Sequence, residues 1–276
     1  MCTCGIRDDK TARLPDGDTV KILSCNAGYL LDYDGSLSEY VLKPHRAMVG
    51  SATAEERATE RLVEVIADEE PDVVCLLEVD QGSVRTASDG QVAWIAELLA
   101  SEGLDYRHRA DTKYGDESLV AELPVLEYLS NGVLVREGLD AAIETHHLDK
   151  GPKRLVTEIR LGDLSIFAVH LAMSGRGRRS QLDELADLVA DRERVVVCGD
   201  FNAYDGLDEV EDVLGAGGLV LHNPGETVPK RPLDRLVTDT RTLDLFLTSP
   251  DVPVSRCDVI PVQVSDHRPV VLEFED

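Results

Sequence analysis

The chain has 276 residues, which is enough for one large α/β domain or two small ones. Its 53 acidic and 28 basic residues give a formal net charge of −25, which at low salt disfavours binding to membrane surfaces and polyanions. Near 1 M salt the Debye length falls to about 3 Å, so the same charge mainly keeps the protein hydrated and no longer opposes a nucleic-acid partner. With only seven lysines, the composition is typical of a salt-adapted (halophilic) cytoplasmic protein, although an ordinary acidic protein can share it.

The sequence predicts one domain behind a short polar leader. Residues 1–18 contain no hydrophobic run, so we expect neither a signal peptide nor a transmembrane segment there. Residues 19–276 show no repeat, linker or low-complexity tract, and we expect them to fold as a unit. Cys25, Cys75 and Cys198 each fall inside an apolar strand-like run, which favours free buried thiols in a reducing compartment over a disulfide framework.

In the first 100 residues, apolar patterns predict two buried strands, each followed by an amphipathic helix. The expected elements are, in order, a strand at residues 20–25, a helix from the capping box at Thr53 and Glu56 to Pro71, a strand at residues 73–77 and a helix around residues 92–99. The two strands deliver Asn26 and Glu78 at their carboxyl ends. The polar segment 29–50 is long for a connection, which suggests that it lines a site.

Beyond residue 104 the pattern shortens, as expected for antiparallel strands joined by tight turns. The expected strands cover residues 119–129, 132–135, 155–159 and 164–169. The last of them delivers His170. A basic loop at residues 174–179 then precedes a helix with the apolar stripe Leu182, Leu185, Ala186 and Val189.

Residues 195–198 predict a strand buried on both faces, because three valines and a cysteine follow one another. Gly199 ends this strand, so Asp200 and Asn202 emerge at its carboxyl end, where open α/β sheets place their chemistry. Gly-Asp and Asn also form turns, so this stretch alone leaves a plain turn open. The remaining expected elements are a short helix near residues 207–214 and strands at residues 242–247 and 269–274.

These elements predict an α/β (α+β) fold with four layers, in which two mixed, mainly antiparallel sheets pack face to face and helices lie outside. Asp244 interrupts an apolar strand, and a buried aspartate is costly unless it has a partner such as a histidine. Glu78 and Asp266 offer hard oxygen ligands suited to Mg²⁺ or Mn²⁺. Phosphoryl transfer needs an activated water, a cation and hydrogen-bond donors, and these residue types supply them.

Seven different short motifs lie along the chain, most of them at the ends of expected strands. They are the strand ending in Asn26, Leu77-Glu78, Asn-Gly-Val-Leu at residues 131–134, Val-His-Leu at 169–171, Gly-Asp-Phe-Asn at 199–202, Leu243-Asp244 and Ser-Asp-His at 265–267. In their order and placement the sequence resembles the endonuclease/exonuclease/phosphatase superfamily, with the fold of deoxyribonuclease I, over about residues 20–275.

The resemblance implies a metal site beside a bound phosphate. Glu78 would carry the metal, with Asn26 and Asp266 beside it or bound through water. Asp200 would orient or deprotonate the attacking water, and Asn202 would donate to the phosphoryl group.

The resemblance also implies roles for two histidines. His170 and His267 would stabilise the developing charge or protonate the leaving oxygen, and Asp244 would hold His267 in its productive tautomer. Members that cleave at abasic sites usually carry a tyrosine and an asparagine where this chain has His170, and often an aspartate where Gly28 stands. Abasic-site repair is therefore not the expected activity, and the inositol-phosphatase signature is absent before Asp244.

Arginines in loops suggest contacts to phosphate beyond the catalytic centre. We expect Arg154, Arg176 and Arg178 to supply them, although arginines in so acidic a chain can equally pair with carboxylates. His146 and His147 match no motif position and are expected on the surface.

The expected function is a Mg²⁺- or Mn²⁺-dependent hydrolase of phosphate esters, in which a metal-organised water attacks phosphorus directly. A nuclease-like phosphodiesterase is the leading candidate, with nucleic acid among its possible substrates. A sphingomyelinase-like enzyme acting on phospholipids and a soluble phosphomonoesterase remain alternatives. A catalytically silent phosphate-binding protein would be expected to lack Glu78, Asp200, Asn202 or His267, and none is missing.

Overall fold

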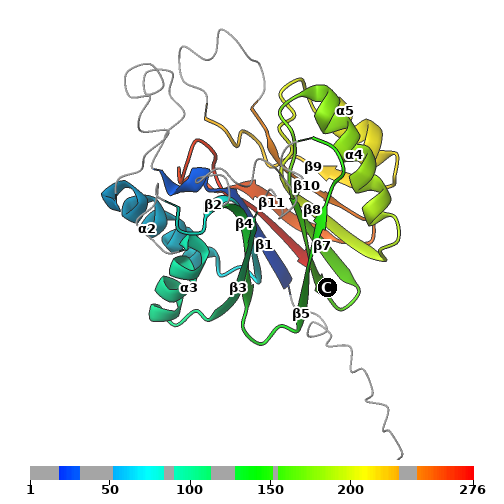
Figure 1. Ribbon diagram of the computed structural model, residues 1–276. Helices are drawn as coiled ribbons and strands as arrows, with labels where there is room; N and C mark the ends of the chain where they lie inside the picture. Colours follow the sequence, from blue (N-terminus) through cyan, green and yellow to red (C-terminus); the bar gives the residue numbers. More distant parts are fainter. Residues whose placement is uncertain (1–18, 32–51, 84–89, 113–127, 152–154, 230–240) are drawn as a thin grey trace, which may run out of the picture.

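The computed structural model describes residues 19–31, 52–83, 90–112, 128–151, 155–229 and 241–276. Two six-stranded sheets pack face to face and helices lie on the outside (Figure 1), which confirms the predicted four-layer fold. The first sheet has the order β11 (Val254–Val259), β12 (Val270–Glu275), β1 (Thr19–Asn26), β2 (Val73–Asp80), β4 (Leu129–Arg136) and β3 (Tyr106–Thr112). The second has the order β5 (Ala141–His147), β6 (Leu155–Leu161), β7 (Leu164–His170), β8 (Arg194–Asp200), β10 (Asp244–Thr248) and β9 (Val220–His222).

Each sheet contains a single parallel pair, β1 with β2 and β7 with β8, and the other neighbours are antiparallel. The crossover after β1 includes helix α2 (Ala52–Glu69), and the crossover after β7 includes helix α4 (Gly175–Val189). Helices α2 and α3 (Gln91–Ser101) cover the first sheet, and α4 with the short α5 (Asp208–Val210) and the π-helical turn η3 (Glu211–Gly215) covers the second (Figure 1). A single 3-10 turn, η1 (Gly28–Leu30), follows β1.

Strand alternation explains why the central strands are apolar on both faces. In β8, Val196 and Cys198 belong to the core between the sheets, whereas Val195 and Val197 pack under the helices of the second sheet. The same alternation along β1, β7 and β10 continues to their ends, where polar side chains take the place of apolar ones. The layer between the sheets therefore ends in a group of polar residues at one edge of the sandwich.

The structure departs from the sequence expectations in two places. Residues 175–179, expected in a basic loop, form the first turns of α4. Two glycines are unfavourable in a helix, and the buried contacts of Arg178 offset this cost. Strands β3, β5, β9 and β11 were not individually predicted, and all four have long exposed or half-buried stretches that weaken the apolar signal. The expected strand at residues 119–129 and the leader at residues 1–18 lie mostly or wholly outside the described residues.

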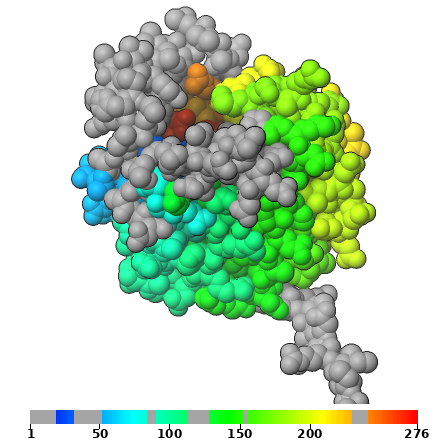
Figure 2. Space-filling model, viewed as in Figure 1, coloured from blue at the N-terminus to red at the C-terminus, as the bar shows by residue number. Residues whose placement is uncertain are grey.

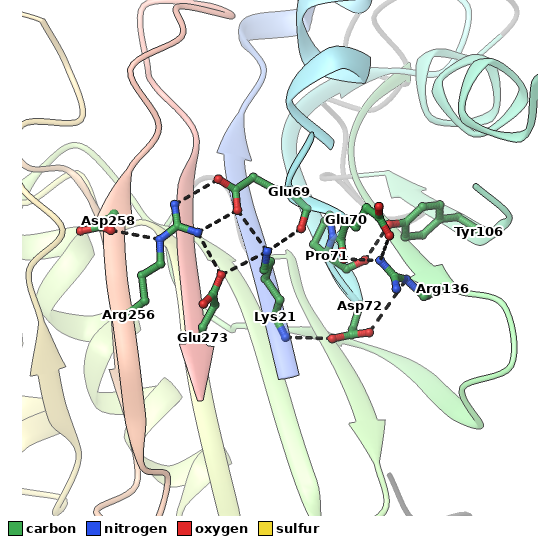
Figure 3. A network of polar contacts seen from close by, with 10 residues as sticks. All are labelled: Lys21, Glu69, Glu70, Pro71, Asp72, Tyr106, Arg136, Arg256, Asp258 and Glu273. Carbon is green, nitrogen blue, oxygen red and sulfur yellow. Dashed lines mark hydrogen bonds and ion pairs between the residues drawn. The ribbon is translucent and has the colours of Figure 1, made fainter. Parts of the chain in front are cut away.

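An ion-pair network ties the C-terminus of α2 to three strands of the first sheet (Figure 3). The Arg256 guanidinium on β11 lies 2.8 Å from Glu69 of α2 and 2.9 Å from Glu273 of β12, and Lys21 of β1 lies 3.1 Å from the same Glu273 oxygen. The hydrogen bond from Arg256 lowers the pKa of Glu69 despite the partial burial of its carboxyl group. Among the described residues, no helix is both long and apolar enough to cross a bilayer.

Candidate active site

Three polar side chains lie in register across the second sheet. Asp200, the last residue of β8, pairs with His170 of parallel β7 on one side and with Asp244 of antiparallel β10 on the other. By strand alternation, all three face the layer between the sheets. The preceding Gly199 has φ +134, and a Cβ atom there would lie 2.0 Å from the carbonyl oxygen of Val169, so only glycine lets the two strands approach this closely.

Asp200 is fixed by contacts from both sheets. One carboxylate oxygen accepts a hydrogen bond of 3.0 Å from the side-chain amide of Asn26, at the end of β1, and lies 3.2 Å from Nε2 of His170. The other oxygen accepts a hydrogen bond of 2.9 Å from the backbone N–H of Asn202. Because Asp200 is 2% exposed, these contacts determine the orientation of its carboxylate.

Glu78 reaches the same site through an irregularity in β2. The register of β2 against β4 shifts between Leu76 and Val79, and Glu78 has φ +52, in the left-handed region. Regular alternation would point Glu78 with Leu76 toward the helices. Instead its Oε1 atom lies 3.9 Å from Nδ1 of His170, so the irregularity turns this carboxylate toward the centre.

Asp244 and His267 form a buried pair. Nδ1 of His267 lies 2.7 Å from Oδ2 of Asp244, and Thr227 Oγ1 accepts the backbone N–H of Asp244 at 3.3 Å. Burial alone would lower the pKa of His267, but the neighbouring Asp244 carboxylate reverses this effect and raises the pKa well above its ordinary value. The Asp244 carboxylate therefore favours the protonated form of His267. Ser265, whose hydroxyl donates to the carbonyl oxygen of Asn26 at 2.6 Å, holds this segment against the end of β1.

Acidic side chains from both sheets gather at this edge. Burial raises the pKa of Asp266, and the nearby carboxylates of Glu78 and Asp200 raise it further, against the opposing effect of His267. One ligand atom each from Asp200, Asp244 and His267 lie within 4.8 Å of one another. Hard oxygen donors that repel one another are what a divalent cation such as Mg²⁺ neutralises, so the residues present fit such an ion.

Asn202 stands in a strained turn immediately after β8. Its φ is +51, and its side-chain amide donates to the carbonyl oxygen of Leu171 at 2.8 Å. The second amide hydrogen has no partner among the described residues and is left for a ligand.

Of the three arginines expected to contact phosphate, Arg178 has another role, Arg176 is exposed on α4, and Arg154 lies outside the described residues. The Arg178 side chain is 1% exposed. Its guanidinium donates to the backbone oxygens of Met173 and Asn202, at 3.1 and 2.6 Å, and to Glu209 at 2.7 Å. The expectation missed this role because burial of the arginine stem on α4 depends on the packing of distant segments.

His146 also differs from expectation. It lies half-buried, with Nε2 2.8 Å from Oε2 of Glu158, whereas His147 is exposed as predicted. Burial alone would raise the pKa of Glu158, but hydrogen bonds from Arg192, His146 and Ser165 outweigh it and lower the pKa to about 2. Although Glu144, His146 and Glu158 lie close enough together to hold an ion, the Arg192 guanidinium already neutralises Glu158.

No pattern in the sequence indicated a role for Thr227, Ser265 or Tyr204. Ser265 appears in a recognisable motif, but its bond to Asn26 joins segments 239 residues apart. Thr227 lies in an irregular segment without any pattern.

Figure 2 shows the surface of the chain's later part (orange and red) between the blue-to-green and the green-to-yellow parts of the molecule, as expected where the two sheets meet.

Comparisons with known proteins agree with this architecture. The model of the Endonuclease/Exonuclease/phosphatase family matches residues 40–267. Similar solved structures include an endonuclease/exonuclease/phosphatase from Beutenbergia cavernae (21% identity, 93% of this chain and 71% of that chain, TM-score 0.66) and a family protein from Leptotrichia buccalis (18%, 93% and 100%, TM-score 0.65). A third is D. rerio TDP2 complexed with a single-strand DNA product (16%, 94% and 99%, TM-score 0.60). Comparison with curated proteins finds no match.

Proposed function

Because the chain belongs to the Endonuclease/Exonuclease/phosphatase family, we propose that it is a divalent-metal-dependent phosphodiesterase that uses water as the nucleophile. The observation that carries the proposal is the convergence on Asp200. Its carboxylate is held by Asn26 from one sheet and by His170 and Asn202 from the other, beside His267, whose protonated form the Asp244 carboxylate favours. A fixed acceptor next to a buried proton donor is the arrangement that hydrolysis of a phosphate ester requires.

In the proposed reaction, the water oxygen attacks phosphorus and its proton passes to Asp200. The bond from phosphorus to the leaving oxygen breaks, and His267 donates its proton to that oxygen. Asp244 keeps the imidazole oriented through Nδ1, so that Nε2 faces the substrate. Asn202 donates to the phosphoryl oxygens as negative charge accumulates on them, and His170 orients the Asp200 carboxylate through Nε2.

Glu78, with Asn26 and Asp266 beside it, would hold Mg²⁺ or Mn²⁺, which supplies charge neutralisation at the phosphoryl oxygens and lowers the pKa of a bound water. The proposal includes both metals. The proposed divalent cation is supported by the hard, anionic donor set and by the raised pKa of Asp266.

The substrate is proposed to be a phosphodiester, with nucleic acid among the candidates. The D. rerio TDP2 structure contains a single-strand DNA product, which supports a diester at a site of this fold. At low salt a net charge of −25 opposes the binding of long polyanions. We therefore propose that the protein acts on short diesters at low salt and also on longer ones at molar salt. The described cysteines are free and mostly buried, which supports the reducing cytoplasm as its location.

The test is turnover on phosphodiesters, phosphomonoesters and a sphingomyelin-type headgroup ester, with Mg²⁺ or Mn²⁺, at low and at molar salt. Asp200→Asn and His267→Ala should each lower kcat on the preferred diester by about 10²- to 10⁴-fold, since each removes a proton-transfer group. Arg160→Gln, at an exposed position on β6, serves as the matched control. Equal turnover by wild type and both variants on every substrate would refute the assignment. Faster turnover of phosphomonoesters or of the lipid headgroup ester would show that the proposed substrate class is wrong.

A further inference from the structure

Exposed apolar side chains concentrate beside the candidate active site. Among the described residues, only Met173, Tyr204 and Val220 are large hydrophobic residues with exposed side chains, at 61%, 41% and 44%. Met173 lies three residues after His170, and Tyr204 lies two residues after Asn202. Two of the three thus stand on the loops that leave the catalytic strands β7 and β8.

A single buried side chain holds these two loops together. Nη1 of Arg178 donates to the backbone oxygens of both Met173 and Asn202, and Nη2 lies 3.4 Å from a carboxylate oxygen of Asp205. The backbone N–H of Tyr204 also donates to the carbonyl oxygen of Asn202 at 2.8 Å. Met173 and Tyr204 are therefore exposed on a braced backbone, which is what a binding surface needs and what a loose loop lacks.

Tyr204 lies within the field of the catalytic carboxylates. Burial of its hydroxyl group raises the pKa of Tyr204 to about 12, and Asp200 and Asp266 contribute to the increase. Arg241 is close enough to oppose this effect on the hydroxyl group. The tyrosine thus keeps its proton, and this partly exposed aromatic side chain lies close enough to Asp200 and Asp266 for their charges to act on its hydroxyl group.

We propose that Met173 and Tyr204 form a platform for one planar aromatic group attached to the scissile phosphate, such as the base of a nucleotide ester. This inference rests on the proposed phosphodiesterase function and names its substrate class. A tyrosine ring stacks on the face of a base, and the polarisable methionine sulfur packs well against aromatic groups. Two side chains are enough for one base. They are too few for a lipid acyl chain, and no further exposed aromatic residue is present in the described part of the chain to extend the stack along a strand.

The experiment compares two diesters with the same chromophoric leaving group, the 4-nitrophenyl ester of thymidine 5′-phosphate and methyl 4-nitrophenyl phosphate. Wild type should favour the base-bearing ester in kcat/KM by about tenfold or more, the size expected for a stacked base. Tyr204→Ala and Met173→Ala should bring this ratio close to one, mainly through KM, and Tyr204→Phe should keep it. Val220→Ala is the control, because it removes the third exposed apolar side chain at a position outside the site.

A second measurement separates this inference from the proposed function. Thymidine 5′-phosphate and inorganic phosphate are titrated calorimetrically into wild type and Tyr204→Ala in the presence of Mg²⁺. The platform predicts that the variant loses about tenfold in affinity for the nucleotide and much less for phosphate. If neither diester is hydrolysed but this binding difference appears, the phosphodiesterase proposal fails and the platform stands. If hydrolysis occurs but the kcat/KM ratio and the nucleotide affinity are the same in Tyr204→Ala as in wild type, the platform is wrong.

Discussion

Replacing Arg178 by alanine distinguishes two roles for the same side chain. The sequence suggests a phosphate contact, whereas the structure buries the guanidinium against Glu209 and the carbonyl oxygens of Met173 and Asn202. A phosphate contact contributes to substrate binding and little to folding. A buried brace contributes to folding and, through Asn202, to the geometry of the turn after β8 in the candidate active site.

The expected loss of stability follows from the groups left behind in Arg178→Ala. The buried carbonyl oxygen of Asn202 loses its charged donor and keeps only the backbone N–H of Tyr204, and a hydrogen bond to a charged group contributes about 1.5–3 kcal/mol. Glu209, 23% exposed, loses a partner at 2.7 Å, which adds about 1 kcal/mol because the carboxylate is partly hydrated. We therefore expect the free energy of unfolding to fall by roughly 3 kcal/mol and kcat to fall with it.

Arg179 provides the matched control on the same helix. It is 50% exposed and pairs at 3.6 Å with Asp183, itself 60% exposed, so Arg179→Ala should change stability by no more than about 0.5 kcal/mol. Urea unfolding gives the stabilities, and steady-state kinetics on the preferred diester gives kcat and KM. If Arg178→Ala raised KM while leaving the free energy of unfolding and kcat unchanged, the guanidinium would be a substrate contact and the bracing role would be wrong.

Three further predictions concern single carboxylates. The folded-state pKa of Glu158 is about 2 against an ordinary 4.5, which at about 1.36 kcal/mol per pKa unit corresponds to roughly 3 kcal/mol of stability present above pH 4.5 and lost as the pH falls toward 2. The stability difference between wild type and Glu158→Gln, measured by urea unfolding, should therefore shrink by about 2 kcal/mol from pH 7 to pH 3, and a constant difference would contradict this. Asp244→Ala should lower turnover more than stability, because the main loss is the orientation of His267. Steady-state kcat and urea unfolding measure the two effects, and an intact kcat with a lost fold would contradict the prediction. Metal-free Asp266→Asn should be at least as stable as wild type by thermal unfolding, since it removes a repelled carboxylate, and should gain less from added Mg²⁺.

The sequence was informative where a local pattern determines the structure. The run of valines before Gly199 identifies a doubly buried strand, and strand polarity then places Asp200 at its carboxyl end. An aspartate in an apolar strand requires a buried partner, and Asp244 lies 2.7 Å from His267. In each case one segment carries the whole argument, because burial and alternation can be inferred from neighbouring residues.

Features that depend on contacts between distant segments could not be predicted from the sequence. Regular alternation points Glu78 away from the site, and only the shifted register of β2 against β4 reverses this. Nothing in the residues around Arg178 distinguishes it from its exposed neighbour Arg179, because the difference arises from the carbonyl groups of two loops that arrive from elsewhere in the chain. Loop geometry and strand irregularities are set by tertiary packing, which no local periodicity encodes.

The origin of the site in two sheets links its chemistry to the packing of the fold. Asn26 and Glu78 come from the first sheet, whereas Asp200 and Asp244 come from the second, and the hydrogen bond from Asn26 to Asp200 crosses between them. Because acidic groups from the two sheets meet at this edge, their repulsion acts against the sheet interface just where the apolar core ends. The core residues behind them, such as Cys198, therefore do more than fill space: they hold the carboxylates close together, as the proposed cation and phosphate site requires.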